Sequence, residues 1–234
     1  MSQAFEAERK IRRDKALGND DFLAILIDAE WDHRQQRKVE RAMKNARFRY
    51  NAVVEQIDMD TRRGLDTTIM QRLIQLSFLQ EQANILLTGP TGCGKSYIAS
   101  AIGQEACLQD YRVRYFSAPK MFPWLRGLKA DGSYLRELRR LDKQDLLIID
   151  DFGLMRLNGD DELSLLDIIE DRHGRASTII TSQLPVAQWY ELFQERTLAD
   201  AILDRIVHSA YRLEMSGESM RKRTRTKTAT SDNS

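Results

Sequence analysis

The sequence contains little cysteine and no long apolar run. Its two cysteines, Cys93 and Cys107, have neither the spacing of a metal site nor a disulfide framework, which is typical of a protein in a reducing cytoplasm. No stretch approaches the ~18 consecutive apolar residues of a membrane helix. Charges interrupt residues 1–17 throughout, so the pattern does not predict a signal peptide. We therefore expect a cytoplasmic protein that does not enter a membrane.

An excess of one charge sign is also missing. Lys and Arg number 36 and Asp and Glu number 35, a net charge of +1, so any affinity for nucleic acid must come from local clusters. The length of 234 residues and the hydrophobic content of 42% suit one large α/β domain with a small appendage. Residues 2–58 have no proline and one glycine, Gly18. We predict a helical N-terminal region over residues 1–60, with helices at 5–17 and 21–50.

The second of these helices is strongly basic from Trp31 onward. Between Trp31 and Tyr50, seven arginines and lysines stand against only Asp32 and Glu40. Helical spacing places several of the cations on one face, which is an electrostatic footprint for phosphate backbones. The alternative is an ordinary solvated helix face. The predicted DNA-contacting residues are Arg34, Arg37, Lys38, Arg41, Lys44 and Arg47.

A phosphate-binding motif follows in the middle of the chain. Residues 89–96 match G-x-x-x-x-G-K-[ST], after a short apolar run at 84–88 and before a helical pattern at 97–109. Glycines let backbone N–H groups wrap phosphates, Lys95 neutralises the β and γ phosphates, and Ser96 is a ligand for Mg²⁺. The predicted nucleotide-binding residues are Gly89, Pro90, Thr91, Gly92, Cys93, Gly94, Lys95, Ser96 and Tyr97.

Two carboxylates end the next strongly apolar run. Residues 146–149 are all Leu or Ile and lead directly into Asp150 and Asp151. Ligand chemistry in open α/β sheets lies at the carboxyl ends of strands. We predict that Asp150 holds Mg²⁺ through water and that Asp151 orients or deprotonates the attacking water.

Further strands are predicted at 113–117, 177–183 and 211–215, and further helices at 67–80 and 186–193. Together these patterns predict an α/β fold over residues 61–223, with a parallel five-stranded sheet flanked by helices. Ser182, at the polar end of one strand, is predicted to sense the γ-phosphate or hold the attacking water; a simple strand-to-loop cap is the alternative. The Thr- and Ser-rich residues 224–234 are predicted to be a disordered tail.

The arrangement resembles the AAA+ branch of P-loop ATPases. More closely, the chain resembles the IstB-like transposition helper ATPases, which are relatives of the DnaC helicase loaders and DnaA initiators. The resemblance covers roughly residues 20–223. Its motifs are Arg63-Gly64-Leu65-Asp66, the 87–96 loop, Asp131-Gly132-Ser133-Tyr134, 145–153, Thr181-Ser182-Gln183, 201–208 and Gly217-Glu218-Ser219-Met220-Arg221.

This resemblance implies roles that the residues alone do not show. Arg205 matches an arginine finger that reaches the ATP of a neighbouring subunit, and Arg221 matches a second sensor arginine on the γ-phosphate. The implied cofactors are ATP and Mg²⁺, and the implied partners are duplex DNA, a transposase and further copies of the chain in a ring or helical filament. Typical AAA+ ATPases have Glu where this chain has Asp151, a shorter acid usual in the IstB and DnaA branches, which suggests slow hydrolysis as a timing switch. Without the resemblance, both arginines fit ordinary surface ion pairs.

Three functions compete at this point. The first is an ATP-dependent transposition helper that assembles on target DNA and recruits or activates a transposase. The second is a DnaC-like replicative helicase loader, which needs an exposed apolar or mixed helix to grip its partner. The dense basic charge of residues 31–50 favours the first. A metabolic kinase, the third, does not need the basic helices, Arg205 or Arg221.

Overall fold

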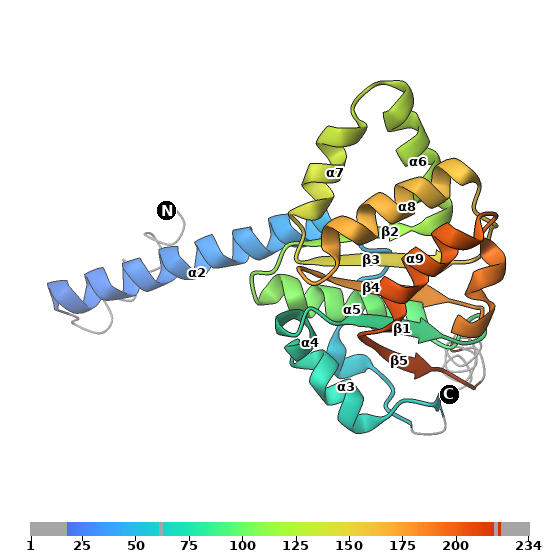
Figure 1. Ribbon diagram of the computed structural model, residues 1–234. Coiled ribbons are helices and arrows are strands. Elements are labelled where there is room, and N and C mark those ends of the chain that lie inside the picture. Colours follow the sequence, from blue (N-terminus) through green and yellow to red (C-terminus); the bar gives the residue numbers. More distant parts are fainter. Residues whose placement is uncertain (1–17, 61–62, 218–219, 221–234) are drawn as a thin grey trace, which may run out of the picture.

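A five-stranded parallel sheet forms the centre of the molecule (Figure 1). The computed structural model describes residues 18–60, 63–217 and 220 of the chain. The strands are β1 (Asn84–Thr88), β2 (Val113–Ser117), β3 (Leu146–Phe152), β4 (Ser177–Ser182) and β5 (Ala210–Glu214). Their order across the sheet is β2-β3-β4-β1-β5, and every neighbouring pair is parallel. The predicted parallel five-stranded sheet is therefore confirmed.

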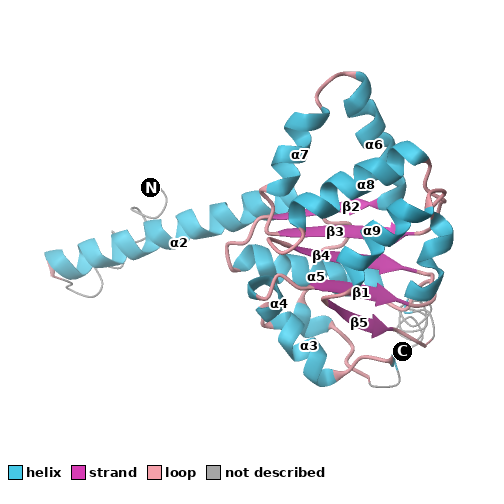
Figure 2. Ribbon diagram, in the orientation of Figure 1, coloured by secondary structure: helices cyan, strands magenta, loops and turns pink. Residues whose placement is uncertain are grey.

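Helices cover both faces of the sheet, as Figure 2 shows. Successive side chains of a strand point to opposite faces, so Leu146 and Ile148 of β3 belong to one core and Leu147 and Ile149 to the other. This double burial explains why the central strands read as unbroken apolar runs. The first core is covered by the end of α2 (Asn19–Ala46), η1 (Val54–Gln56), α3 (Thr67–Ile74), α4 (Ser77–Gln80) and α5 (Lys95–Leu108). The second is covered by α6 (Ala118–Ala130), α7 (Tyr134–Asp142), α8 (Gly159–Arg172), η3 (Val186–Leu192) and α9 (Arg196–Val207).

Helix α2 extends away from the domain at one end and packs on it at the other (Figure 1). It has 28 residues, a length of about 42 Å at 1.5 Å per residue. It ends at Ala46 because Arg47 adopts a left-handed conformation with φ 61°. Phe48 then turns onto the first core, where its ring lies against Gly103 and edge-on to Tyr115. The helix predicted at 21–50 was therefore too long at its carboxyl end.

Two other predicted helices differ from the structure. The helix expected at 67–80 is interrupted at Leu76, whose φ of 61° starts a new turn, so α3 and α4 are separate. The segment expected at 186–193 is the 3-10 helix η3 rather than an α-helix. The helix predicted at 5–17 and the tail at 224–234 lie outside the described residues. Within the described ranges, no helix is both long and apolar enough to cross a membrane.

The second core depends on one large aromatic side chain. Trp189 of η3 is 0% exposed, its ring lies 5.0 Å from that of Phe152, and its indole N–H donates to the Leu184 carbonyl at 3.0 Å. We expect Trp189→Ala to lower the free energy of unfolding by about 3–5 kcal/mol because it leaves a cavity. Trp189→Phe should cost less, about 1–2 kcal/mol, mainly through the lost hydrogen bond.

Urea unfolding of the two variants measures both effects. The matched control is Trp31→Ala, because Trp31 on the projecting half of α2 is 63% exposed and its loss should change stability by less than about 0.5 kcal/mol. Equal costs for Trp31→Ala and Trp189→Ala would contradict this account of the core.

Candidate functional site

The predicted phosphate loop connects β1 to α5 and is held by backbone hydrogen bonds from the segment after β5. The Met215 N–H donates to the Thr88 carbonyl at 2.7 Å, and the Met220 N–H donates to the Gly92 carbonyl at 2.9 Å. Gly89 has φ 140°, and a Cβ there would lie 2.1 Å from the Met215 carbonyl oxygen. Only glycine allows the loop to lie this close to the segment after β5.

The lysine of the loop is buried and turned inward. The Lys95 ammonium donates to the carbonyls of Gly89 at 2.6 Å and Pro90 at 2.8 Å, and lies 3.7 Å from the Cys93 sulfur. The Cys93 side chain packs in the first core, which agrees with a small residue that fits the loop. Helix α5 begins at Lys95, so its amino-terminal N–H groups and partial positive charge face the loop.

An arginine whose contact the sequence did not predict supports this loop. Arg63 was recognised only as part of a motif, but its side chain is buried and donates to the Cys93 carbonyl at 2.6 Å. The same guanidinium donates to the Asp58 carbonyl. A buried cation therefore ties the loop to the segment that leads into α3.

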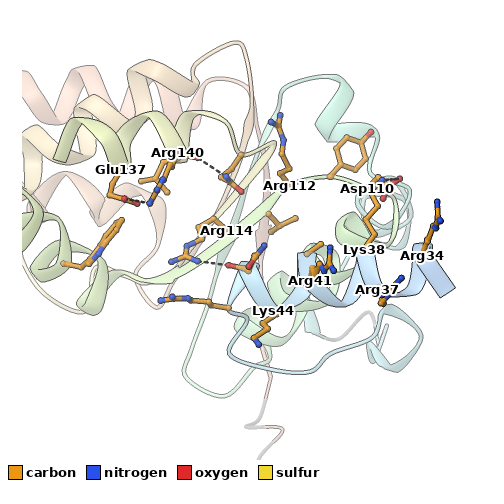
Figure 3. Close-up of a pocket in the computed structure, with 18 residues that line it drawn as sticks. Arg34, Arg37, Lys38, Arg41, Lys44, Asp110, Arg112, Arg114, Glu137 and Arg140 are labelled. Atoms are coloured by element: carbon orange, nitrogen blue, oxygen red, sulfur yellow. Dashed lines mark hydrogen bonds and ion pairs between the residues drawn. The ribbon is translucent and has the colours of Figure 1, made fainter. Parts of the chain in front are cut away.

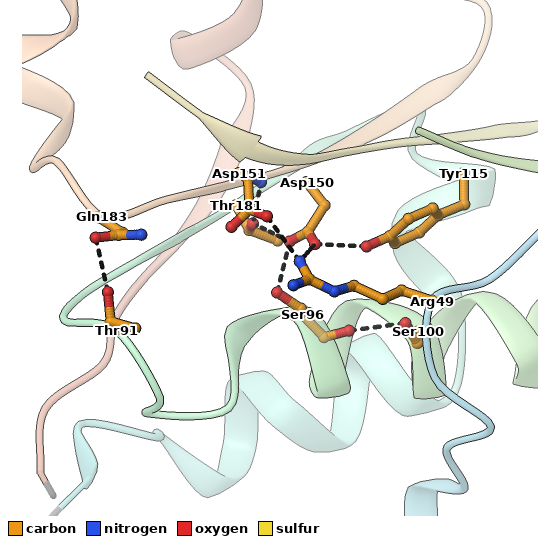
Figure 4. Close-up of polar contacts among 9 residues, drawn as sticks. All are labelled: Arg49, Thr91, Ser96, Ser100, Tyr115, Asp150, Asp151, Thr181 and Gln183. Atoms are coloured by element: carbon orange, nitrogen blue, oxygen red, sulfur yellow. Dashed lines mark hydrogen bonds and ion pairs between the residues drawn. The ribbon is translucent and has the colours of Figure 1, made fainter. Parts of the chain in front are cut away.

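Asp150 is the most enclosed acid of the site, with 0% exposure. One carboxylate oxygen accepts from Ser96 Oγ at 2.7 Å and from the Thr181 hydroxyl; the other accepts from the Tyr115 hydroxyl and from Arg49 at 3.3 Å (Figure 4). The predicted Mg²⁺ ligands, Ser96 and Asp150, are thus in direct contact. A hydroxyl and a carboxylate are hard oxygen donors, so the pair suits Mg²⁺.

Asp151 is partly exposed and has an unusual backbone. Its φ of 59° is left-handed, and the pairing of β3 with β4 is irregular between Ile149 and Phe152. Among residues with a side chain, Asp and Asn tolerate this conformation best. The bulge therefore gives a physical reason for aspartate rather than glutamate here. Its carboxylate accepts from Arg49 at 2.7 Å (Figure 4).

The environment of these acids shifts the pKa of two neighbours. Burial, with the nearby charge of Asp150, raises the pKa of Tyr115, so the phenol keeps its proton and donates. Burial is the largest single influence on the pKa of Arg49 and lowers it, but the hydrogen bond to Asp151 together with nearby negative charge, that of Asp151 included, raises the pKa overall. The sequence indicated neither role: Tyr115 was read only as part of a strand, and Arg49 only as one cation of the basic run.

Ser182 lies beside the site, but its hydroxyl faces elsewhere. It is fully buried, donates to the Phe152 carbonyl at 2.7 Å and accepts from the Leu184 N–H at 3.1 Å. This is the strand-to-loop cap that was the alternative. Its two neighbours contact the site instead: Thr181 donates to Asp150, and Gln183 accepts from the Thr91 hydroxyl at 2.7 Å.

These elements surround a cavity of about 550 Å³. Its lining includes six of the predicted nucleotide-binding residues, Thr91, Gly92, Gly94, Lys95, Ser96 and Tyr97. Arg49, Tyr50 and Ile57, which lie between α2 and α3 in the sequence, line it as well. The Tyr97 hydroxyl also donates to the Gln56 side chain at 3.0 Å, so α5 and η1 are joined at the cavity.

Arg205 lies far from its own phosphate loop. It is in the last turn of α9, its side chain donates to Glu170 at 3.0 Å, and its carbonyl accepts from the Asn84 amide at 3.3 Å. Asn84 starts β1 and Thr88 ends it, so Arg205 is at the amino edge of the sheet and the loop is at the carboxyl edge. Arg221 lies outside the described residues.

A basic groove of about 1090 Å³ lies between α2 on one side and β2 and α7 on the other (Figure 3). All six predicted DNA-contacting cations line it, together with Arg112, Arg114 and Arg140. Lys38 pairs with Asp110 and Arg34 with Glu30, but among the described residues no acid pairs with Arg37, Arg41, Lys44 or Arg47. Burial, and secondarily the charge of Arg47, lowers the pKa of Arg114. Arg112 and Arg140 pair with Asp145 and Glu137, but the nine cations outnumber the two acids in the described part of the lining, Asp110 and Glu137, so the net charge of the groove is positive.

Comparison with known proteins gives consistent results. The model of a family described as IstB-like ATP binding protein matches residues 1–228. An insertion-sequence ATP-binding protein of Sinorhizobium fredii is 42% identical over 227 residues, which cover 97% of this chain and 93% of the relative. Two solved structures share the fold. The DnaC helicase loader has a TM-score of 0.56 at 20% identity and covers 68% of this chain and 96% of its own. AMPPCP-bound DnaA from Aquifex aeolicus has a TM-score of 0.61 at 17% identity, and the match covers 80% of this chain and 57% of the DnaA chain. These likenesses confirm the predicted AAA+ fold.

The close approach at Gly89 can be tested against a matched glycine. Gly132 also has a positive φ, of 77°, but a Cβ there would meet nothing within 4 Å. We expect Gly132→Ala to cost about 1–2 kcal/mol of unfolding free energy from backbone strain alone. Gly89→Ala should cost at least about 3 kcal/mol because the segment at Met215 must also move. Chemical denaturation measures both, and equal costs would contradict the role assigned to the Met215 contact.

Proposed function

Because the chain belongs to the family of IstB-like ATP-binding proteins, we propose that it is an ATP-dependent helper of transposition. In this proposal it binds ATP, assembles on duplex DNA, hydrolyses ATP slowly as a switch, and recruits or activates a transposase. The observation that carries the proposal is the direct connection between the basic groove and the nucleotide cavity. Both are lined by the same stretch of chain, which runs from Lys44 in the groove to Tyr50 in the cavity.

The phosphate loop binds ATP through the groups that already converge on it. The α5 amino terminus and the loop N–H groups hold the phosphates, and Lys95 turns from the carbonyls of Gly89 and Pro90 toward them. Ser96 and Asp150 would hold Mg²⁺, which neutralises charge on the phosphates when bound. Tyr50, Ile57 and Tyr97 line the part of the cavity on which the base can lie.

For hydrolysis, we assign Asp151 to the attacking water. Asp151 is more exposed than Asp150, and of these two acids only Asp151 lines the cavity. Thr181 supports it, since the Asp151 N–H donates to the Thr181 hydroxyl at 3.1 Å. Gln183 is better placed than Ser182 to sense the γ-phosphate because it lines the cavity and bonds to Thr91. Ser182 then acts indirectly, by holding the turn after β3.

Arg205 supports an oligomeric active form. Its position at the amino edge of the sheet separates it from its own cavity by the length of β1, about 16 Å for five residues. We infer that it acts on the ATP of a neighbouring copy, for which its side chain must first leave Glu170. For Arg221, which lies outside the described residues, we propose the role that the family resemblance implies, a contact with the γ-phosphate of the same subunit.

A helicase loader is the second candidate, and one observation favours it. The projecting half of α2 exposes Leu23, Ile27 and Trp31 at helical spacing, a surface that could grip a protein partner. The DnaC structure with the same fold is that of a helicase loader. Tight binding to a replicative helicase without nucleotide-dependent duplex binding would select this alternative.

The groove predicts how duplex binding depends on salt. We expect Arg37→Ala, Arg41→Ala and Lys44→Ala together to reduce the slope of log affinity against log salt by about 2.7, which is about 0.9 for each lost phosphate contact. Binding of a fluorescent, non-hydrolysable ATP analogue should stay unchanged. Fluorescence anisotropy with a labelled duplex at several salt concentrations measures the slope.

A triple variant with the same loss of charge serves as the control. Arg72, Arg136 and Arg175 are exposed and do not line the groove, so replacing these three with Ala should leave the slope within about 0.5 of the wild type. If both triple variants reduce the slope equally, the groove is not the DNA site.

The division of the active site between subunits can be tested by mixing two inactive variants. Lys95→Ala removes the phosphate contact, and Arg205→Ala removes the finger; each alone should lower ATP turnover by about 10³-fold. A mixture should recover activity, because a Lys95→Ala subunit can supply Arg205 to an intact loop. Failure to recover would contradict action in trans, and wild-type turnover above about 10 s⁻¹, the median for enzymes, would contradict a slow switch.

A further inference from the structure

The carboxylate of Asp150 is fully occupied by protein donors. A carboxylate has about four acceptor positions. Ser96, Thr181, Tyr115 and Arg49 supply four donors, two to each oxygen (Figure 4). Mg²⁺, or a water bound to it, can reach Asp150 only if one of these donors moves away.

Only Arg49 is able to leave without disturbing the sheet or the phosphate loop. Tyr115 and Thr181 belong to β2 and β4 and are buried, and Ser96 is itself a predicted ligand. The Arg49 side chain is 42% exposed and lies on the segment after α2 rather than on a strand. It is also the one donor that carries charge, and it bridges Asp150 and Asp151. A guanidinium and a divalent cation bound to the same pair of carboxylates would repel each other strongly, so the two acids hold one or the other.

We propose that Arg49 competes with Mg²⁺ for Asp150 and Asp151, so that its release is a step in loading the magnesium-bound nucleotide. Arg49 is in this sense a positioning residue: it holds the two carboxylates in place between rounds of binding and sets the Mg²⁺ concentration that the site requires. The inference rests on the proposed binding of ATP and Mg²⁺ and adds a specific role for a residue outside the AAA+ motifs.

The position of Arg49 also couples the two sites. It follows Arg47 and Phe48, and Arg47 lines the groove while Phe48 is packed against Gly103. The groove side chain Arg114 donates to the Asn45 carbonyl at 2.7 Å, so the end of α2 is tied to β2 as well. A phosphate backbone that binds Lys44 and Arg47 pulls on the residues that carry Arg49. DNA in the groove therefore weakens the hold of Arg49 on the acids, and by linkage Mg²⁺-nucleotide strengthens DNA binding.

The experiment measures binding of a fluorescent, non-hydrolysable ATP analogue as Mg²⁺ is titrated. In Arg49→Ala, the Mg²⁺ concentration at half-maximal analogue binding (the Mg²⁺ midpoint) should fall about tenfold. This factor corresponds to the free energy of one hydrogen bond between charged groups. Arg49→Lys keeps the charge and should stay within about threefold of the wild type. The matched control is Arg136→Ala, an exposed arginine paired with Glu137 on α7, whose midpoint should not change.

Three results would overturn the proposal. They are an unchanged midpoint in Arg49→Ala, a raised midpoint, and weaker analogue binding at saturating Mg²⁺, the last of which would make Arg49 a direct nucleotide ligand. A wild-type protein that binds no analogue at any Mg²⁺ concentration would instead contradict the proposed function itself.

A second titration, with saturating duplex DNA present, tests the coupling. Duplex should lower the wild-type midpoint at least about threefold and leave that of Arg49→Ala unchanged, although this variant still binds the duplex. An equal shift in both proteins would show that DNA acts on the site by another route and would overturn the coupling through Arg49.

Discussion

The buried carboxylate of Asp150 needs hydrogen-bond donors, and this need determines how the segments around the nucleotide cavity are arranged. Asp150 has no exposure to solvent, and an isolated carboxylate in that position would cost several kcal/mol. Four donors from four different segments satisfy it: the start of α5, the middle of β2, the carboxyl-terminal part of β4, and the chain after α2. The strand order β2-β3-β4 puts β3 between two of these partners. The relative positions of phosphate loop, sheet and N-terminal segment at this edge therefore all depend on one side chain.

The N-terminal segment is more than an attachment to the nucleotide-binding domain. Ala46 and Ala52 are buried in the first core, and Phe48 fills the space that the lack of a side chain at Gly103 leaves. This contact holds the end of α2 against the domain, whereas the basic face of the helix remains open along the groove. In the coupling proposed above, a change in the groove would reach the nucleotide cavity through these few packed residues, which is the physical requirement for coupling between two sites.

The sequence was informative wherever the structure depends on local pattern. Buried strands such as β3 read as apolar runs, and the phosphate loop and Asp150 followed from spacing and strand context. The roles of Arg49, Arg63 and Tyr115 were not predictable, because each contact joins segments 30 or more residues apart. Ser182 shows a different limit. Side chains alternate along a strand, so the Ser182 hydroxyl bonds to the Phe152 carbonyl while the neighbours Thr181 and Gln183 contact Asp150 and Thr91, and sequence alone does not show which face a residue occupies. Left-handed residues at Arg47 and Leu76 ended or broke helices whose apolar spacing continued.

The two ends of strand β1 lie at different functional parts of the protein. The carboxyl end of the strand opens into the phosphate loop and its amino end holds the backbone of Arg205, so the two parts of the shared site proposed above face opposite ways. Copies joined through these parts can associate only head to tail, an arrangement that closes into a ring or continues as a helix. In an open helix the subunit at one end always has a phosphate loop with no neighbour to complete it. Such an assembly would have a chemically distinct tip, at which bound nucleotide persists longest. A partner could then recognise the growing end, while hydrolysis removes subunits from the interior.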